Sequence, residues 1–115
     1  MLHKLILICC LLLSSVKGID SQKVRHGSLD GFVEGQVVHI VNSQKIYGKM
    51  EPYQTIIREK LKPGSARYNF LMRQCTTLYK ATLGKSGLSL IVEFDGVNKK
   101  LHKTEDVTQK LISLL

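Results

Sequence analysis

The sequence predicts a small α+β domain in which antiparallel hairpins pack against helices. Three observations predict this class. Segments rich in β-branched residues precede residue 48 and follow residue 87, turn-forming pairs interrupt both segments, and apolar residues recur at helical spacings between them. The expected order of elements is β-β-α-α-β-β-α, with the helices covering one face of a small, largely antiparallel sheet.

Residues 1–18 have the three-part pattern of a secretory signal peptide. A short positive start is followed by an unbroken apolar run that ends at Leu13, and then by mostly small residues up to Gly18. The run is too short for a membrane-spanning helix, which needs about 20 apolar residues. We therefore expect cleavage after Gly18, loss of Cys9 and Cys10 with the leader, and export of a chain without a membrane span.

Residues 19–31 contain few apolar positions and several turn formers, so we expect a loosely ordered lead-in there. A single domain is expected to cover residues 32–115. Its first hairpin pairs the stretch "FVEGQVVHIV" with "QKIYG", through a turn at Asn42 and Ser43.

Two helices are expected after this hairpin. Pro52 suits the first turn of a helix, where its missing N–H is not needed, and the Pro-Gly pair at 63–64 ends that helix. Ser65 is a good N-cap for a second helix over residues 66–83, which a glycine then ends.

A second hairpin and a last helix close the predicted domain. Residues 88–94 alternate, with Ile91 as the exception, as in a half-buried strand. The Asp-Gly pair at 95–96 favours a tight turn, and residues 97–103 return as an edge strand. Thr104 can cap the last helix. The inner face of that helix is expected to contain Val107, Leu111, Leu114 and Leu115. This closing unit resembles the end of a thioredoxin-like domain, which gives an alternative fold, although the Cys-x-x-Cys of redox-active members is absent.

Cys75 is the only cysteine left after removal of the leader, which argues against a disulfide-stapled mini-protein. It lies within an apolar stripe on the second predicted helix. The stripe consists of Tyr68, Leu71, Met72, Cys75, Leu78 and Tyr79. A free cysteine behaves as a small apolar residue, so its place in this stripe predicts a thiol packed in the core. Burial would make that thiol unreactive. Two alternatives stay open, an intermolecular disulfide through Cys75 and a reactive thiol.

The sequence contains no recognisable catalytic or cofactor motif. His26, His39 and His102 fall in three separate predicted elements and form no pair at metal-ligand spacing. Nucleophile elbows, phosphate-binding loops and dinucleotide-binding glycines are absent from the sequence. We therefore expect a protein that is not an enzyme and that uses no cofactor.

The stretch Gln36-Val37-Val38 resembles the first hairpin loop of the cystatin family of cysteine-protease inhibitors. In that family the loop ends in glycine, where this sequence has Ile40, and the long helix precedes the loop instead of following it. The resemblance implies a protease inhibitor as one alternative role.

The exported chain is basic. Lys4 and Lys17 leave with the leader, so 15 of the 17 basic residues remain against 9 acidic ones. The candidate anion-binding residues are Arg58, Lys60, Lys62 and Arg67 around the predicted helix break, and Lys99, Lys100 and Lys103 on the second hairpin. Such groups attract sulfated polysaccharide or anionic lipid, and the alternative is a solvated surface that keeps the protein soluble. Nucleic acid is not an expected partner of an exported protein.

Together these observations predict a small secreted, non-enzymatic protein that binds another extracellular protein or a receptor, as a soluble signal or modulator. The reasoning is by exclusion, from export, a single domain and the lack of a catalytic motif. Binding of an anionic polysaccharide or lipid and inhibition of a protease are the alternatives. We expect either a monomer or a dimer linked through Cys75.

Overall fold

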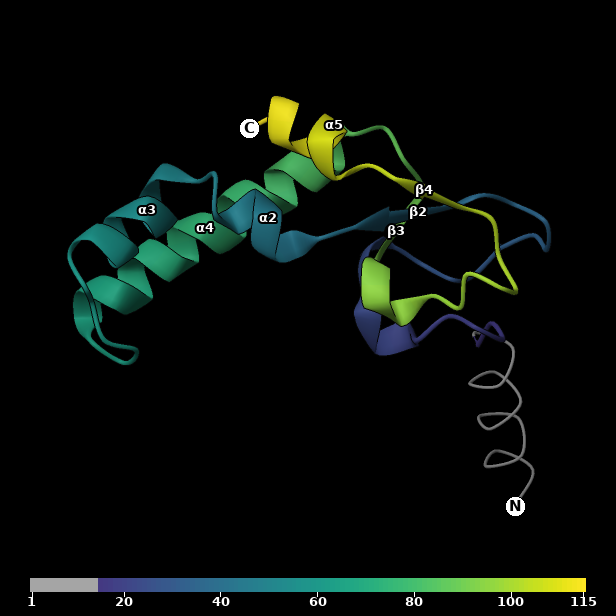
Figure 1. The fold of residues 1–115 in the computed structure, drawn as a ribbon, viewed down its shortest axis with the longest axis horizontal. Helices are drawn as coiled ribbons and strands as arrows, with labels where there is room; N and C mark the ends of the chain where they lie inside the picture. The colour runs from purple at the N-terminus through teal and green to yellow at the C-terminus, as the bar shows by residue number, and fades with distance from the viewer. Residues whose placement is uncertain (1–14) are drawn as a thin grey trace, which may run out of the picture.

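Four short strands form one sheet in the computed structural model, which describes residues 15–115 (Figure 1). In the spatial order β1-β3-β2-β4, the strands are β1 (Val24–Gly27), β3 (Leu90–Glu93), β2 (Val38–Val41) and β4 (Thr104–Asp106). The α-helices of the described residues are α2 (Ser43–Tyr47), α3 (Glu51–Arg58), α4 (Ala66–Lys85) and α5 (Thr108–Ser113). Two 3₁₀ turns are η1 (Ser21–Lys23) and η2 (Phe94–Gly96). The predicted small single α+β domain is confirmed, but the prediction of a largely antiparallel sheet is wrong, because two of the three strand pairings are parallel.

Most of the predicted signal peptide, residues 1–14, lies outside the described residues. The last part of it lies against the domain. Gly18 O accepts a hydrogen bond from Asn98 N at 2.7 Å, and Lys17 O lies 2.7 Å from His102 Nε2. The predicted cleavage after Gly18 would remove both contacts.

β3 is a central strand, and all four of its residues are buried. It pairs antiparallel with β1 and parallel with β2, and β2 pairs parallel with β4. The segment from α2 to α4 makes the long crossover that the parallel β2–β3 pair requires. A continuous apolar run such as Leu90-Ile91-Val92 is typical of a strand buried on both faces.

Neither predicted hairpin forms. Residues 44–48 do not return as a strand, because Ser43–Tyr47 folds as α2 and directs the fully buried Ile46 into the core. Residues 97–103 form a loop, and the strand that follows them pairs with β2 instead of β3. Both edges of β3 are already occupied, by β1 and β2, so no edge remains for a hairpin partner. The thioredoxin-like alternative rested on that closing hairpin and loses its basis.

Residues 19–31 belong to the folded domain, and the prediction of a loosely ordered lead-in is wrong. β1 pairs with β3, and Ile19 and Leu29 are buried. Gly27 has a φ of +80°, and a Cβ at this position would lie 1.8 Å from the carbonyl oxygen of Ser89. Backbone pairing with a central strand orders this segment despite its few apolar residues, because the pairing does not depend on side chains.

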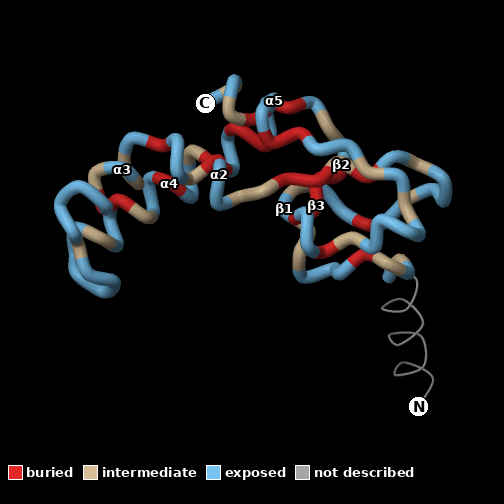
Figure 2. The backbone as a smooth tube through the Cα atoms, in the orientation of Figure 1, coloured by how far each residue is buried: buried red, intermediate tan, exposed pale blue. Residues whose placement is uncertain are grey.

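The sheet separates two apolar clusters, because Ile91 belongs to one cluster and its neighbours Leu90 and Val92 belong to the other. The buried residues follow the strands and the inner sides of the helices (Figure 2). The cluster under α4 contains Val41, Ile46, Met50, Cys75, Tyr79, Leu83, Ile91, Val107 and Leu111. The cluster on the other face contains Ile19, Leu29, Val38, Ile40, Leu90 and Val92, with Val16, Val24, Phe32 and Val97 packed against it. The helices therefore cover one face of the sheet, and the N-terminal segment helps to cover the other.

α4 begins where the sequence predicts, with Ser65 as its N-cap and the Ser65 hydroxyl accepting from Tyr68 N at 3.2 Å. Its N-terminal half and α3 extend beyond the sheet as a helical hairpin (Figure 1). None of the helices in residues 15–115 is long and apolar enough to cross a membrane.

The last helix begins later than expected. Thr104 lies in β4, and α5 starts at Thr108, whose backbone N–H donates to Asp106 Oδ1 at 2.9 Å. Hydrogen bonding to Thr108 holds the pKa of the Asp106 carboxyl below its usual value. Val107 and Leu111 are buried as predicted, whereas Leu115 is exposed.

Candidate functional site

The two predicted basic groups lie at opposite ends of the molecule (Figure 1). Arg58, Lys60, Lys62 and Arg67 surround the turn between α3 and α4, whereas Lys99, Lys100 and Lys103 lie in the loop that precedes β4. The fold therefore does not bring them together into a single positive face.

Acidic neighbours offset part of the first group. Arg67 makes two hydrogen bonds to the Glu59 carboxylate, at 3.1 and 2.8 Å, and these lower the pKa of Glu59. Arg58 Nη2 lies 3.8 Å from Glu51 Oε1. Lys60 and Lys62 have no ion pair with any described residue. These two lysines therefore carry the positive charge of the turn that no acidic side chain offsets.

Cys75 is fully buried on the inner side of α4, within the cluster that this helix covers. Burial raises the pKa of its thiol. Both observations fit a packed core thiol. A disulfide to a second chain would require α4 to separate from the rest of the core.

The stretch Gln36-Val37-Val38 is not a hairpin loop. Val38 is the first residue of β2, is fully buried, and donates its N–H to Lys103 O at 2.8 Å. The loop geometry that the cystatin resemblance implies is therefore absent, and this stretch leads into the sheet.

A cleft of about 420 Å³ lies between β1, α2, α3 and α4, and we term it the tyrosine cleft. Its lining residues are Val24, Arg25, Ser43, Gln44, Tyr47, Tyr53, Thr76, Tyr79, Lys80 and Leu83. Each of the three helices contributes one tyrosine. Ligand sites commonly have this size and this mixture of aromatic walls with a few polar groups.

The ring of Tyr47 packs against the rings of both other tyrosines of the cleft. The rings of Tyr47 and Tyr79 meet edge to face, with centroids 5.2 Å apart and an interplanar angle of 84°. Tyr53 also packs against Tyr47, with the two ring centroids 6.3 Å apart. Edge-to-face packing is a favoured aromatic arrangement, so the walls of the cleft stabilise each other.

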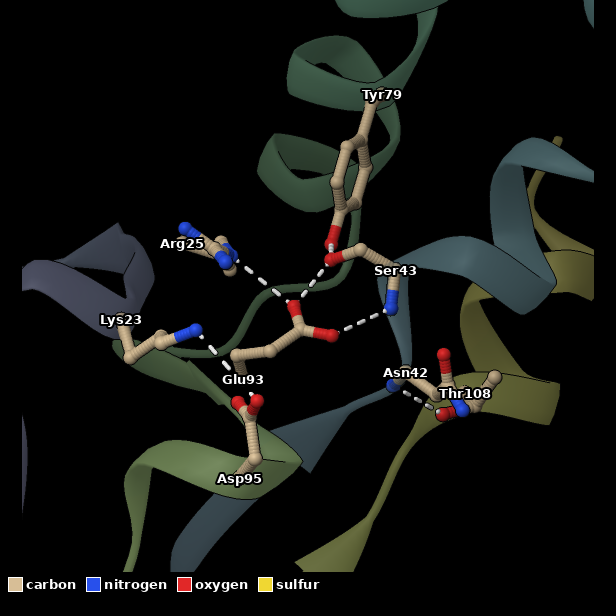
Figure 3. A network of polar contacts seen from close by, with 8 residues as sticks. All are labelled: Lys23, Arg25, Asn42, Ser43, Tyr79, Glu93, Asp95 and Thr108. Carbon is tan, nitrogen blue, oxygen red and sulfur yellow. Dashed lines mark hydrogen bonds and ion pairs between the residues drawn. The ribbon is translucent and has the colours of Figure 1, made fainter.

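The buried carboxylate of Glu93 accepts hydrogen bonds from two residues of the cleft lining, Arg25 and Ser43 (Figure 3). Its Oε1 accepts from Ser43 N at 2.8 Å. Its Oε2 accepts from Arg25 Nε at 3.0 Å and from the Ser43 hydroxyl. A buried carboxylate is tolerated only with such partners, and these three bonds connect β1, α2 and β3.

Tyr79 extends the same network. The Ser43 hydroxyl donates its one proton to Glu93, so the Tyr79 hydroxyl must be the donor in its hydrogen bond with Ser43 Oγ. Burial raises the pKa of Tyr79 to about 12, so the phenol stays protonated at alkaline pH values at which an unperturbed tyrosine ionises. The position of the Tyr79 ring in the cleft is thereby set by a hydrogen bond as well as by packing.

The network connects neighbouring elements through hydrogen bonds. Both oxygens of Glu93 accept hydrogen bonds from donors of the protein itself. Within residues 15–115, no three His, Cys, Asp or Glu side chains gather as a metal site would require. The cleft itself offers aromatic surface, with Arg25 and Lys80 among its lining residues.

Sequence reasoning did not find this site. Tyr47 falls in a stretch with the pattern of a return strand, which would direct it away from Tyr79. Glu93 falls on the polar face of a predicted half-buried strand, where a carboxylate needs no partner. One signal in the sequence pointed towards the site. Tyr53 and Tyr79 lie on the apolar sides of two consecutive predicted helices.

No protein-family model, curated protein or solved structure matches this chain. Function is therefore inferred from the geometry and chemistry of the tyrosine cleft. The two basic groups are separated, and the cleft is where side chains from four elements converge.

Proposed function

We propose that the chain is a small secreted protein without catalytic activity, which binds another extracellular protein at the tyrosine cleft as a soluble signal or modulator. One observation carries the proposal: Tyr47, Tyr53 and Tyr79 converge on a cleft that Arg25 also lines. Tyrosine and arginine are among the side chains that dominate the binding energy of protein interfaces.

The cleft is organised before any partner arrives. The edge-to-face packing fixes the rings of Tyr47 and Tyr79, and the hydrogen bond to Ser43 fixes the Tyr79 hydroxyl. A tyrosine has only two side-chain torsions to immobilise, so a rigid aromatic cleft loses little conformational entropy on binding. This favours recognition of a protruding side chain of a partner.

Filling the cleft tests this proposal without weakening the core. Thr76 is exposed and lines the cleft, and Thr77, also exposed, lines a different groove along α4. A Thr76→Trp substitution adds a bulky ring to the cleft, and Thr77→Trp is the matched control. We expect the wild type and the control to capture the same partner from the native extracellular fluid, and Thr76→Trp to bind it at least about 10-fold more weakly.

Equal capture by both tryptophan variants would mean that the partner binds elsewhere. Loss of capture by both would indicate a general effect of tryptophan on α4. Circular dichroism and thermal unfolding of each variant separate loss of binding from loss of folding.

Secretion is the second part of the proposal. Expression of the full chain in a secretory cell should release a protein that begins at Ile19, because the leader pattern ends with small residues up to Gly18. Sequencing of the released protein from its N-terminus measures this directly. A cytosolic product that retains Met1 would contradict an extracellular role.

A further inference from the structure

The tyrosine cleft continues along α4 into a second hollow. This hollow is lined by Asn69, Met72, Arg73 and Thr76, and Thr76 also lines the cleft. These residues and Lys80 are spaced by three or four positions or are neighbours, so they follow one side of the helix. The cleft and the hollow together are termed the α4 groove.

The α4 groove is positively charged. Its lining includes Arg25, Arg73 and Lys80 and no Asp or Glu. The carboxylate of Glu93 offsets the charge of Arg25, whereas Arg73 and Lys80 have no ion pair with any described residue. The whole of α4 contains four basic and no acidic residues, so this charge is not neutralised within the helix.

The two uncompensated cations have a defined spacing. Arg73 and Lys80 are seven positions apart, which places their Cα atoms about 10 Å apart along the helix axis, nearly in one row. A peptide in the polyproline II conformation, which is extended and has three residues per turn, rises about 9 Å in three residues, so side chains three positions apart lie on the same side. Carboxylates three positions apart on such a chain therefore match the two cations.

We propose that the α4 groove binds an extended acidic segment of the partner protein, with one aromatic or large apolar side chain in the tyrosine cleft and carboxylates facing Arg73 and Lys80. This inference rests on the proposed function and adds the chemistry of the partner. The charge of the groove complements an acidic segment, and the aromatic walls of the cleft complement its apolar anchor. A lipid surface would suit a protruding apolar face, whereas this site is hollow.

Selection of peptides on the secreted protein tests the inference. A phage library of random dodecapeptides is selected on the wild type after removal of phage that bind Thr76→Trp. We expect the recovered peptides to carry acidic residues three positions apart near an aromatic or large apolar residue. Their affinity should fall as the salt concentration rises, because exposed charges are screened.

Charge-removing variants then locate the carboxylates. Arg73→Gln and Lys80→Gln should each weaken a selected peptide about 3-fold, and the double variant about 10-fold. Lys85→Gln is the matched control, because Lys85 lies on the same helix but outside the groove. This variant should change affinity by less than about 2-fold, since a distant exposed charge is screened.

Each other outcome overturns the inference in a distinguishable way. Recovered peptides without acidic residues, or peptides insensitive to both glutamine variants, would leave the cleft as the binding site and reject an acidic partner. Failure to recover peptides sensitive to Thr76→Trp would reject the cleft as a peptide site. Binding of phosphatidylserine-containing vesicles, lost in the double variant, in place of peptide binding would assign the groove to a membrane surface.

Discussion

Ser43 donates both its backbone N–H and its hydroxyl to the carboxylate of Glu93, with the nitrogen 2.8 Å from Oε1. The two residues are 50 positions apart, and their contact joins the first residue of α2 to the last residue of β3. The same contact supports the lining of the tyrosine cleft, because Tyr79 donates to the hydroxyl that Ser43 presents to Glu93. Fold stability and cleft geometry therefore depend on one small polar network.

The first prediction concerns Ser43→Ala. This change leaves Glu93 with two of its three donors and leaves the Tyr79 hydroxyl without its acceptor. We expect the free energy of unfolding to fall by about 1–3 kcal/mol, the usual effect of leaving buried polar groups unsatisfied. Urea denaturation followed by circular dichroism measures it.

Ser113→Ala is the control for this change. The Ser113 hydroxyl donates only to Lys110 O on the exposed side of α5, so its removal should change stability by less than about 0.5 kcal/mol. Equal stability of Ser43→Ala and the wild type would mean that the network around Glu93 contributes little to the fold.

A second prediction follows from the protonation of Tyr79. The pKa of this phenol is about 12 in the folded protein and 10.0 for an unperturbed tyrosine, so on raising the pH the unfolded chain loses its proton first. Stability from this group is therefore complete below pH 10 and is lost as the pH rises towards about 12. The loss amounts to at most about 2–3 kcal/mol.

Comparison with Tyr79→Phe isolates this contribution, because lysines and the other tyrosines titrate in both proteins. Denaturation at several alkaline pH values should show the wild type losing stability faster than Tyr79→Phe above pH 10, where the unfolded phenol ionises. Parallel stability curves for the two proteins would indicate that Tyr79 ionises in the folded state as it does in a free chain.

The class of fold could be predicted from the sequence, whereas the strand pairing could not. Local signals were sufficient for α4, where Ser65 caps the helix and the apolar stripe around Cys75 faces the core. Pairing depends on which strand occupies the centre. The run Leu90-Ile91-Val92 lies in a segment with the alternation of a half-buried hairpin strand, although it is buried on both faces and has partners on both edges.

The tyrosine cleft was unpredictable for the same reason. It needs Tyr47 in a helix, and the helical form of Ser43–Tyr47 depends on contacts with residues far along the chain, notably Glu93 and Thr108. A five-residue helix has no strong local signal, because isolated short helices are unstable in water. Tertiary contacts therefore determine that α2 is helical, and they also place Tyr47 in the lining of the cleft.

The third prediction tests the pairing of β1 with β3. Gly27 and Gly31 have nearly the same backbone conformation, with φ of +80° and +79°, but only at Gly27 would a Cβ collide with backbone, 1.8 Å from Ser89 O. Gly31→Ala should cost about 1–2 kcal/mol from its positive φ alone. Gly27→Ala should cost at least about 3 kcal/mol, because the strands must also separate.

The difference between the two glycine variants, measured by urea denaturation, reports the close approach of the strands and cancels the shared backbone strain. Equal destabilisation by both substitutions would contradict the contact between β1 and β3. It would also restore the interpretation of residues 19–31 as a loosely ordered lead-in.

The last prediction concerns the accessibility of Cys75. Its side chain is fully buried and its thiol pKa is raised, so both access and thiolate formation oppose reaction in the folded protein. A thiol-specific reagent should modify Cys75 at least about 10³-fold more slowly in the native protein than in denaturant, because reaction requires opening of the core. Thr76→Cys places a second thiol on the exposed side of the same helix and should react at once.

Non-reducing electrophoresis of the purified protein completes this test. A monomer with a protected thiol is expected, since a bridge to a second chain needs the Cys75 sulfur at the surface, and α4 holds it inside the cluster that contains Met50, Tyr79 and Leu83. A dimer that reductant separates, or a native thiol as reactive as the one in Thr76→Cys, would show that α4 leaves this cluster in solution. The tyrosine cleft would then open as well, because Tyr79 and Leu83 lie on the same helix and line it.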